Sequence, residues 1–329
     1  MWKSVSCEVQ GKGHIKTNTP CQDKTITLDR NGVQFIALAD GAGSARFSHY
    51  GAREVVNCAA MYITDNFSRL IENDDGKQVK QEILDIIRNS LDATSAIHEC
   101  SLSDLASTLL AVAVFEDNYL IVHVGDGVIG YLNGSQLKTA SIPENGEFAN
   151  VTTFVTSKDA IHSMRLYKGR VKDISGFVLM SDGTEQSLYH KPTKTLAKAI
   201  IKLMQRTCLL EANVIKEQLH STFNAVITQN TQDDCSIALL VRPIGVLRDY
   251  TTLDMTEKCD VIGLCTQSTS TKKRLSWFDD VVQFLETPRK LKCIARYMRL
   301  KPKHTQKRLQ KLVECGLIAK HGEAYTSRT

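Results

Sequence analysis

The strongest constraint on the fold is a set of five apolar runs rich in β-branched residues. They are VQFIALAD (33–40), TLLAVAVF (108–115), YLIVHVGD (119–126), GFVLMSD (176–182) and CSIALLV (235–241). Several of these runs are apolar at nearly every position, which predicts strands in sheets that are buried on both faces. The short turns EDN (116–118) and NGS (133–135) favour antiparallel hairpins between neighbouring strands.

Four other stretches have apolar residues at three- and four-residue steps, which is typical of amphipathic helices. They span residues 53–67, 79–97, 193–205 and 212–228. Long helices combined with antiparallel sheets predict a layered α+β domain rather than a parallel, doubly wound one.

The bulk composition is that of an ordinary globular protein. The chain has 329 residues, 42% of them apolar and 23% charged. It has no apolar run of about 18 residues, so we expect no membrane span. The N-terminal stretch MWKSVSCEVQGKGH lacks the apolar region of a secretory signal, and the ten cysteines include no Cys-x-x-Cys pair. We therefore expect a reduced, cytoplasmic protein without a disulfide framework or a structural zinc site.

Charge is distributed unevenly along the chain. Residues 272–329 carry 15 basic and 5 acidic side chains, a net charge of +10, whereas residues 1–271 carry 26 basic and 31 acidic ones, a net charge of −5. Opposite charges suggest two modules with different partners. We predict a first domain over residues 1–245, a linker over 246–274 that ends in a Ser/Thr/Lys cluster, and a basic domain over 275–329.

Aspartates mark the ends of several apolar runs. Three runs end in Asp-Gly, at Asp40-Gly41, Asp126-Gly127 and Asp182-Gly183; the pair Asp233-Asp234 precedes the last run, and Asp23 precedes ITL. A single Asp-Gly is most simply a hairpin turn. Several carboxylates gathered at one rim of a sandwich would repel one another unless cations bound among them. Hard oxygen ligands without a histidine or thiol cluster favour Mg²⁺ or Mn²⁺, and two such ions can promote hydrolysis of a phosphate ester.

The glycine-rich stretch FIALADGAGSARFSHYGA (35–52) could by itself cradle a phosphate, hold a metal or turn a strand into a helix. Comparison with the other strand ends favours a metal role for its aspartate. The glycine after that aspartate lets the backbone approach closely, so that a carbonyl can join the coordination shell.

The motifs form an ordered series over residues 1 to about 242. The series is GHIKTNTPCQDK, ALADGAGS, LASTLLAVAV, VHVGDG, VLMSDG and DDCSIALLV. It resembles the metal-dependent serine/threonine protein phosphatases of type 2C (the PPM family, bacterial type). The resemblance implies a four-layer α-β-β-α sandwich of two antiparallel sheets flanked by helices, with a binuclear Mn²⁺ or Mg²⁺ centre at one end.

The resemblance also implies roles for individual residues. Asp40 would bridge both metal ions, and the carbonyl of Gly41 would bind one of them. Asp182 and Asp234 would complete the shell of the other ion, and Asp126 would contribute to a possible third ion. The nucleophile in the family is a metal-bridging water or hydroxide, with no covalent phosphoenzyme.

This sequence departs from the family pattern near the metal centre. Asp23 lies where the family has an acidic residue close to the metals, but Gln22 stands where many members have glutamate. Ala42 replaces a histidine that has been assigned as general acid in some members. The arginine that grips phosphate in many members is absent from the segment Lys16-Thr17-Asn18.

Arg46 is our hypothesis for the missing phosphate grip, with His14 and Lys16 behind it. The competing interpretation of Arg46 is a solvated residue in the first turn of a helix.

The basic C-terminal segment contains three amphipathic helix candidates, over residues 277–286, 289–298 and 304–318, followed by a small β-turn-β element. This order resembles a winged helix-turn-helix domain. If the domain binds DNA, phosphate contacts would come from Lys303, Lys307, Arg308 and Lys311. Such modules also serve as protein-docking units, so both partners stay open.

The leading functional prediction is a phosphatase acting on phosphoserine and phosphothreonine in proteins, opposed to a cognate kinase in bacterial signalling. Gln22 and the missing arginine leave open a catalytically weak scaffold that binds phosphoproteins. A regulator whose C-terminal domain binds DNA is a further alternative.

Overall fold

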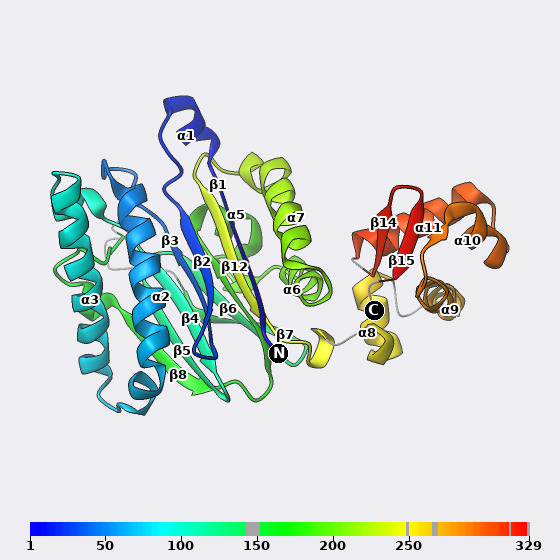
Figure 1. Ribbon diagram of the computed structural model, residues 1–329, viewed down its shortest axis with the longest axis horizontal. Helices are drawn as coiled ribbons and strands as arrows, with labels where there is room; N and C mark the ends of the chain where they lie inside the picture. Colours follow the sequence, from blue (N-terminus) through cyan, green and yellow to red (C-terminus); the bar gives the residue numbers. More distant parts are fainter. Residues whose placement is uncertain (143–151, 248–249, 265–268, 316, 328–329) are drawn as a thin grey trace. The chain divides into compact units, whose positions relative to one another are not determined.

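The computed structural model describes residues 1–142, 152–247, 250–264, 269–315 and 317–327 (Figure 1). The chain divides into two compact units. The first unit comprises Met1–Ile200 and Ala212–Val241, and the second comprises Ile201–Glu211 and Arg242–Thr329. Residues 201–211, which the sequence analysis placed in the domain 1–245, therefore group with the C-terminal part of the chain.

The first unit is built on two five-stranded antiparallel sheets. One has the order β1 (Lys3–Val9), β12 (Cys235–Val241), β9 (Ile174–Met180), β6 (Val128–Asn133) and β7 (Gln136–Ser141). The other has the order β2 (Lys24–Arg30), β3 (Val33–Ala39), β4 (Leu109–Phe115), β5 (Asn118–Val124) and β8 (Arg165–Arg170). The predicted hairpin turns at 116–118 and 133–135 join β4 to β5 and β6 to β7.

Helices cover these sheets. Helices α2 (Ser48–Glu72) and α3 (Gly76–Ile97) pair with each other, and α2 packs on β2 and β3, while α7 (Ala212–Ala225) packs on β1 (Figure 1). The shorter elements are α1 (Lys12–Thr17), η1 (Leu102–Leu105), α4 (Ala160–Ser163), α5 (Asp182–Leu188), β10 (Tyr189–His190), β11 (Thr195–Leu196) and η2 (Ile227–Gln229). This arrangement confirms the predicted α+β fold with two antiparallel sheets.

The almost continuous apolar runs follow from burial on both faces of a sheet. In β3, Phe35 and Ala37 pack into the core beneath α2 and α3. Their neighbours Ile36 and Leu38 point the other way, into a second core between the sheets that includes Phe177. Because side chains alternate across a strand, both sets must be apolar.

The helix predicted over 193–205 begins later than expected. The antiparallel pair β10 and β11 takes up residues 189–196, and α6 runs over Ala199–Leu209. The polar residues HKPTKT (190–195) suit a tight hairpin better than a first helical turn.

The second unit is predominantly helical, with a small sheet. Its remaining elements are η3 (Gly245–Leu247), η4 (Tyr250–Thr252), α8 (Met255–Ile262), α9 (Thr269–Phe284), β13 (Arg289–Lys290), α10 (Leu291–Tyr297), α11 (Pro302–Glu314), β14 (Ile318–His321) and β15 (Ala324–Ser327). The three strands form an antiparallel sheet in the order β13-β15-β14. Helix, strand, two helices and a hairpin follow the order expected for a winged-helix unit, and that assignment stays a prediction.

The segment 246–274 differs from the predicted linker. Residues 248–249 and 265–268 lie outside the described residues, as does Gly316 in the predicted turn into the wing. The described remainder is largely helical, and Tyr250 and Cys259 are buried in the same core as Phe278. Its apolar side chains recur at helical spacing between polar ones, and packing against the C-terminal helices stabilises them as helices.

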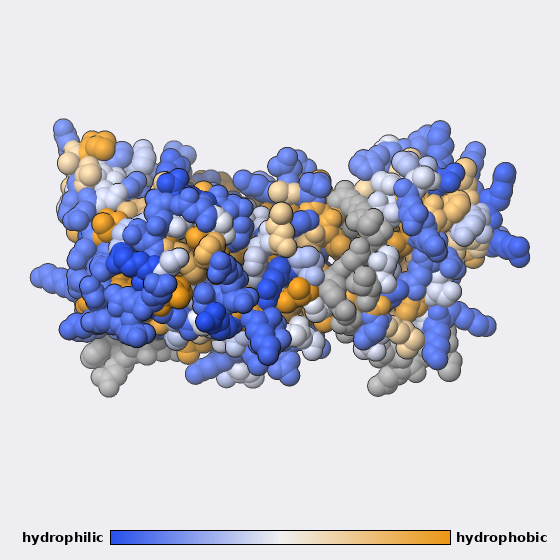
Figure 2. Space-filling model, turned by 60° about the horizontal axis from the view of Figure 1, so that its bottom comes forward, coloured by the Kyte–Doolittle hydropathy of each residue, from blue (hydrophilic) through white to orange (hydrophobic). Residues whose placement is uncertain are grey.

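No helix in the described part of the chain is long and apolar enough to cross a membrane. The face in Figure 2 is mostly hydrophilic, with apolar residues in small, scattered areas.

Candidate metal centre

Four aspartates come together because of the strand directions. Asp40 follows β3 and Asp126 follows β5, and these two strands run parallel on either side of β4. Asp182 follows β9 and Asp233 precedes β12, which is antiparallel to β9, so both lie at one end of their pair. We call Asp40, Asp126, Asp182 and Asp233 the carboxylate cluster.

The members of the carboxylate cluster influence one another electrostatically. Burial raises the pKa of Asp40 well above its usual value, and the charges of Asp23, Asp182, Asp233 and Asp126 raise it further. The pKa of Asp182 rises to about 6, first through burial and then through Asp233 and Asp126, although a hydrogen bond with Asp40 partly offsets this rise. Mutual repulsion of this kind is relieved when a cation binds between the carboxylates.

The donor set fits hard divalent cations. The cluster offers carboxylate oxygens, the ligands preferred by Mg²⁺ and Mn²⁺. Within the described ranges, no three acidic, cysteine or histidine side chains converge closely enough to make a metal site from protein ligands alone. That geometry is compatible with Mg²⁺, which usually keeps several water ligands.

Gly41 lies where no side chain would fit. A Cβ atom at this position would lie 2.8 Å from Cβ of Ser48. Its N–H donates to the carbonyl of Gln22 at 3.2 Å, which ties this loop to the segment that carries Asp23. The role of its carbonyl as a metal ligand stays a prediction.

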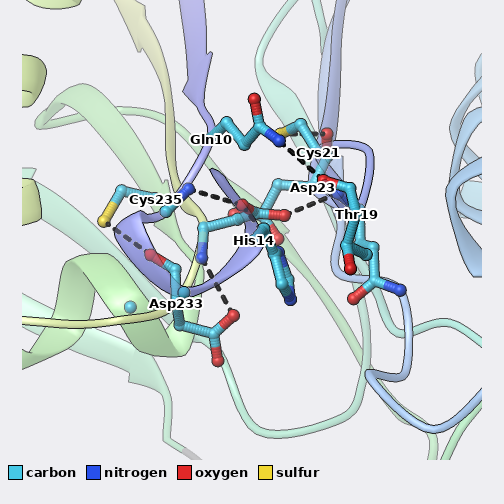
Figure 3. A network of polar contacts seen from close by, with 12 residues as sticks. Gln10, His14, Thr19, Cys21, Asp23, Asp233 and Cys235 are labelled. Atoms are coloured by element: carbon cyan, nitrogen blue, oxygen red, sulfur yellow. Dashed lines mark hydrogen bonds and ion pairs between the residues drawn. The ribbon is translucent and has the colours of Figure 1, made fainter. Parts of the chain in front are cut away.

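The structure places Asp234 differently from the sequence analysis. Its Oδ1 accepts the N–H of Gly11 at 2.6 Å and lies 2.9 Å from Nδ1 of His14, and its Oδ2 accepts the N–H of Gln22 at 2.5 Å. Both oxygens are thus used to hold the segment around α1. Asp233 instead raises the pKa of Asp40 and Asp182, and its Oδ1 accepts the N–H of Asp234 at 2.9 Å (Figure 3). Nothing in the sequence DDCS distinguished the two aspartates.

Asp23 lies beside the cluster in a fully buried position. Burial, with smaller contributions from Asp234 and Asp182, raises its pKa to about 8, although the hydroxyls of Ser236 and Ser181 favour its charged form. Among the described residues, neither of its carboxylate oxygens accepts a hydrogen bond of good geometry. A buried carboxylate in this state is a group that a nearby cation or ordered water would stabilise.

The expected phosphate grip, Arg46, stacks on its neighbour Phe47. The side chain of Arg46 is exposed, and its guanidinium lies 4.8 Å from the centre of the Phe47 ring. Hydrogen bonds from Ser101 lower the pKa of Asp104, and the charge of Arg46 lowers it further. Of the other two candidates, His14 pairs with Asp234, and Lys16 is exposed on α1.

Lys191 is a cation near the cluster that no sequence motif predicted. Lys191, directly after β10, forms an ion pair with Glu185 of α5. Glu185 first, and then Asp182 and Asp126, raise the pKa of Lys191. No motif marked this lysine, because its proximity to the site depends on how the β10–β11 hairpin folds back onto α5.

Comparisons with known proteins identify the family of this chain. The family model described as protein phosphatase 2C matches residues 10–224. Serine/threonine-protein phosphatase 3 of Escherichia coli (strain K12) is 28% identical over 255 residues, which are 72% of this chain and 97% of that protein. The chain belongs to the protein phosphatase 2C family.

Solved structures share the fold. The catalytic domain of the phosphatase PstP, in complex with two manganese ions, has a TM-score of 0.51 at 15% identity, covering 73% of this chain and 97% of that one. The serine/threonine phosphatase of S. agalactiae has a TM-score of 0.50 at 16% identity, covering 73% and 99%. The family resemblance, the fold and the enzyme class predicted from the sequence, a type 2C protein phosphatase, are confirmed.

Proposed function

We propose that the chain is a Mn²⁺- or Mg²⁺-dependent phosphatase that hydrolyses phosphoserine and phosphothreonine in protein substrates. The observation that carries the proposal is the carboxylate cluster, in which repulsion between four aspartates creates a site for divalent cations. Family membership supports the reaction, and the manganese complex of PstP supports the choice of metal.

Each member of the site has a separate task in this proposal. Asp40 would bind two ions, and Asp182 and Asp233 would hold one of them. The carbonyl of Gly41 would add a ligand. Asp126 would bind a third ion. When bound, the ions lower the pKa of an attacking water and neutralise the phosphate charge. Asp234 would support this site by fixing the segment around α1, since its carboxylate accepts the N–H groups of Gly11 and Gln22.

The test is hydrolysis of a phosphothreonine peptide with Mn²⁺, comparing wild type with Asp40→Asn and Asp182→Asn. We expect each substitution to lower kcat by about 100-fold or more, because one charge that holds the ions is lost. Asp117→Asn, an exposed carboxylate in the β4–β5 turn, is the matched control and should retain full activity. Wild-type hydrolysis no faster than that of the two cluster variants would remove the enzymatic proposal and favour a scaffold that binds phosphoproteins.

The cellular setting belongs to the same proposal. A phosphatase of this kind would reverse the action of a serine/threonine kinase in bacterial signalling, and the predicted location is the cytoplasm. The first unit would carry out catalysis and the second would recognise a partner.

We infer that the second unit binds a polyanion such as duplex DNA rather than docking on a protein. The exposed face of α11 carries Lys303, Gln306, Lys307 and Gln310, with no large apolar side chain, whereas protein interfaces are enriched in aromatic residues and depleted in lysine. Of the cations predicted to contact phosphate, Arg308 lies 4.9 Å from the Trp277 ring centre, and Lys311 donates to the carbonyl of Gly263 at 3.2 Å.

A groove beside α11 extends this polar surface. Gln306 lines it together with Lys290, Lys292 and Lys320. Lys290 forms an exposed ion pair with Glu323 at 3.3 Å. Exposed ion pairs contribute little to stability, and the other lysines keep the groove basic. Basic side chains on a helix and on the adjacent hairpin favour contacts to a nucleic-acid backbone.

A further inference from the structure

We propose that Lys191 is the residue that grips the substrate phosphoryl group, in place of the family arginine that this chain lacks. The proposal rests on the phosphatase function proposed above and names a further binding residue for the same site.

The position of Lys191 is set by α5. Glu185 follows Asp182 by three residues in this helix, so the two side chains lie on one face, about one turn apart. The ammonium of Lys191 pairs with Oε1 of Glu185, which places a positive charge about one turn of α5 from Asp182. The influence of Asp182 and Asp126 on Lys191 agrees with this placement.

The way Lys191 is held suits a contact with substrate. The side chain of Glu185 is only 1% exposed, whereas that of Lys191 is 65% exposed. The buried carboxylate therefore anchors an ammonium that solvent and substrate can reach. An ammonium has three donors, and Glu185 is its one hydrogen-bond or ion-pair partner among the described residues, so donors remain for phosphoryl oxygens.

Three other cations that could bind phosphate have partners of their own among the described residues. The ammonium of Lys24 donates to the carbonyls of Cys21 and Asp23 at 2.6 and 2.9 Å. His14 pairs with Asp234, and Arg46 stacks on its neighbour Phe47. Lys191 thus combines proximity to Asp182 with an accessible charge.

The experiment compares wild type with Lys191→Ala and Lys191→Arg, at saturating Mn²⁺. The readouts are KM and kcat for a phosphothreonine peptide, the inhibition constant of inorganic phosphate, and Mn²⁺ affinity by calorimetry. We expect Lys191→Ala to raise KM and the phosphate inhibition constant about tenfold, which is the loss of one charge-assisted hydrogen bond, with Mn²⁺ affinity unchanged. Lys191→Arg should restore both constants to within about threefold, because a guanidinium binds phosphate equally well.

Lys198→Ala is the matched control, since Lys198 is an exposed lysine seven positions further along the chain. Equal effects of the Lys191 and Lys198 substitutions, or a fall in Mn²⁺ affinity at unchanged phosphate affinity, would overturn the proposal. Calorimetric phosphate binding to the Mn²⁺-loaded protein tests the role of Lys191 without requiring catalysis. It therefore distinguishes failure of the Lys191 proposal from failure of the proposed enzymatic function. An inactive wild type whose phosphate binding still depends on Lys191 would refute the enzymatic proposal and leave the phosphate site in place.

Glu185→Gln tests the anchor. The neutral amide can still accept a hydrogen bond but no longer fixes the ammonium by charge, so KM should rise by less than in Lys191→Ala. Combining the two substitutions should add little to Lys191→Ala, because both act through the same contact. Additive effects would mean that Glu185 acts independently of Lys191.

Discussion

At the scale of single residues, two neighbouring aspartates have different tasks. The charge of Asp233 raises the pKa of Asp40 and Asp182. Both carboxylate oxygens of Asp234 instead accept backbone N–H groups. From the sequence, Asp234 was expected to be the metal ligand before β12, although nothing in the DDCS motif separates the two aspartates. The conformation of the loop before β12 sets the difference, because it directs Asp234 to Gly11, His14 and Gln22 while Asp233 influences Asp40 and Asp182.

Conservative substitution of these two aspartates should separate binding from stability. Asp233→Asn should weaken Mn²⁺ binding at least tenfold and leave the metal-free protein as stable as wild type or more so, because one repelling charge is lost. Asp234→Asn should lower the free energy of unfolding by about 1–3 kcal/mol, since its amide group would face an N–H donor. Calorimetry with Mn²⁺ and urea unfolding in a chelator give the two quantities. The reverse pattern would restore Asp234 as the ligand.

At the scale of secondary structure, most elements were predictable from sequence because their apolar periodicity is strong. The strand β12 begins and ends as expected, α2 is longer than predicted at both ends, and α3 begins three residues earlier and ends as predicted. The start of α6 and the helices within 246–274 were missed, since short polar segments take their conformation from packing partners that the sequence does not reveal.

Close packing between α2 and η1 gives a prediction that opposes helix propensity. Replacing a helical glycine by alanine normally stabilises a helix by about 1 kcal/mol. In Gly51→Ala the new Cβ would lie 2.0 Å from the carbonyl oxygen of Leu105, so we expect the free energy of unfolding to fall by about 1–3 kcal/mol. Urea unfolding measures the change.

The control for this substitution is Gly76→Ala at the first position of α3, where the nearest atom, in Leu166, lies 4.0 Å away. It should leave stability unchanged or raise it slightly. A stabilising effect of Gly51→Ala would show that α2 and η1 separate easily.

At the scale of the whole molecule, the chain joins an acidic catalytic unit to a basic one. The net charges of −5 over residues 1–271 and +10 over 272–329 follow from the sequence alone. Which cations face solvent depends on the fold, as Lys303 and Lys307 are exposed on α11 while Arg308 is half-buried against Trp277.

Binding of the full chain to a DNA duplex should therefore depend steeply on salt. The double substitution of Lys303 and Lys307 by alanine should reduce the slope of log K against log salt by about two, because each phosphate contact contributes about −0.9. The matched double substitution of Lys272 and Lys273 removes the same charge from α9 and should change the slope little. Salt-insensitive binding, or equal effects of both pairs, would exclude α11 as the contact surface.

The class of protein was readable from the sequence, because an ordered series of short motifs and buried strands ending in aspartate specifies both the sandwich and the chemistry of its rim. It also determined the charge of the C-terminal unit. Three features required the tertiary structure: Asp233 rather than Asp234 influences Asp40 and Asp182, Arg46 stacks on Phe47, and Lys191 pairs with Glu185. These assignments depend on the directions of side chains in loops, where no periodic pattern exists and where contacts with distant segments fix the conformation.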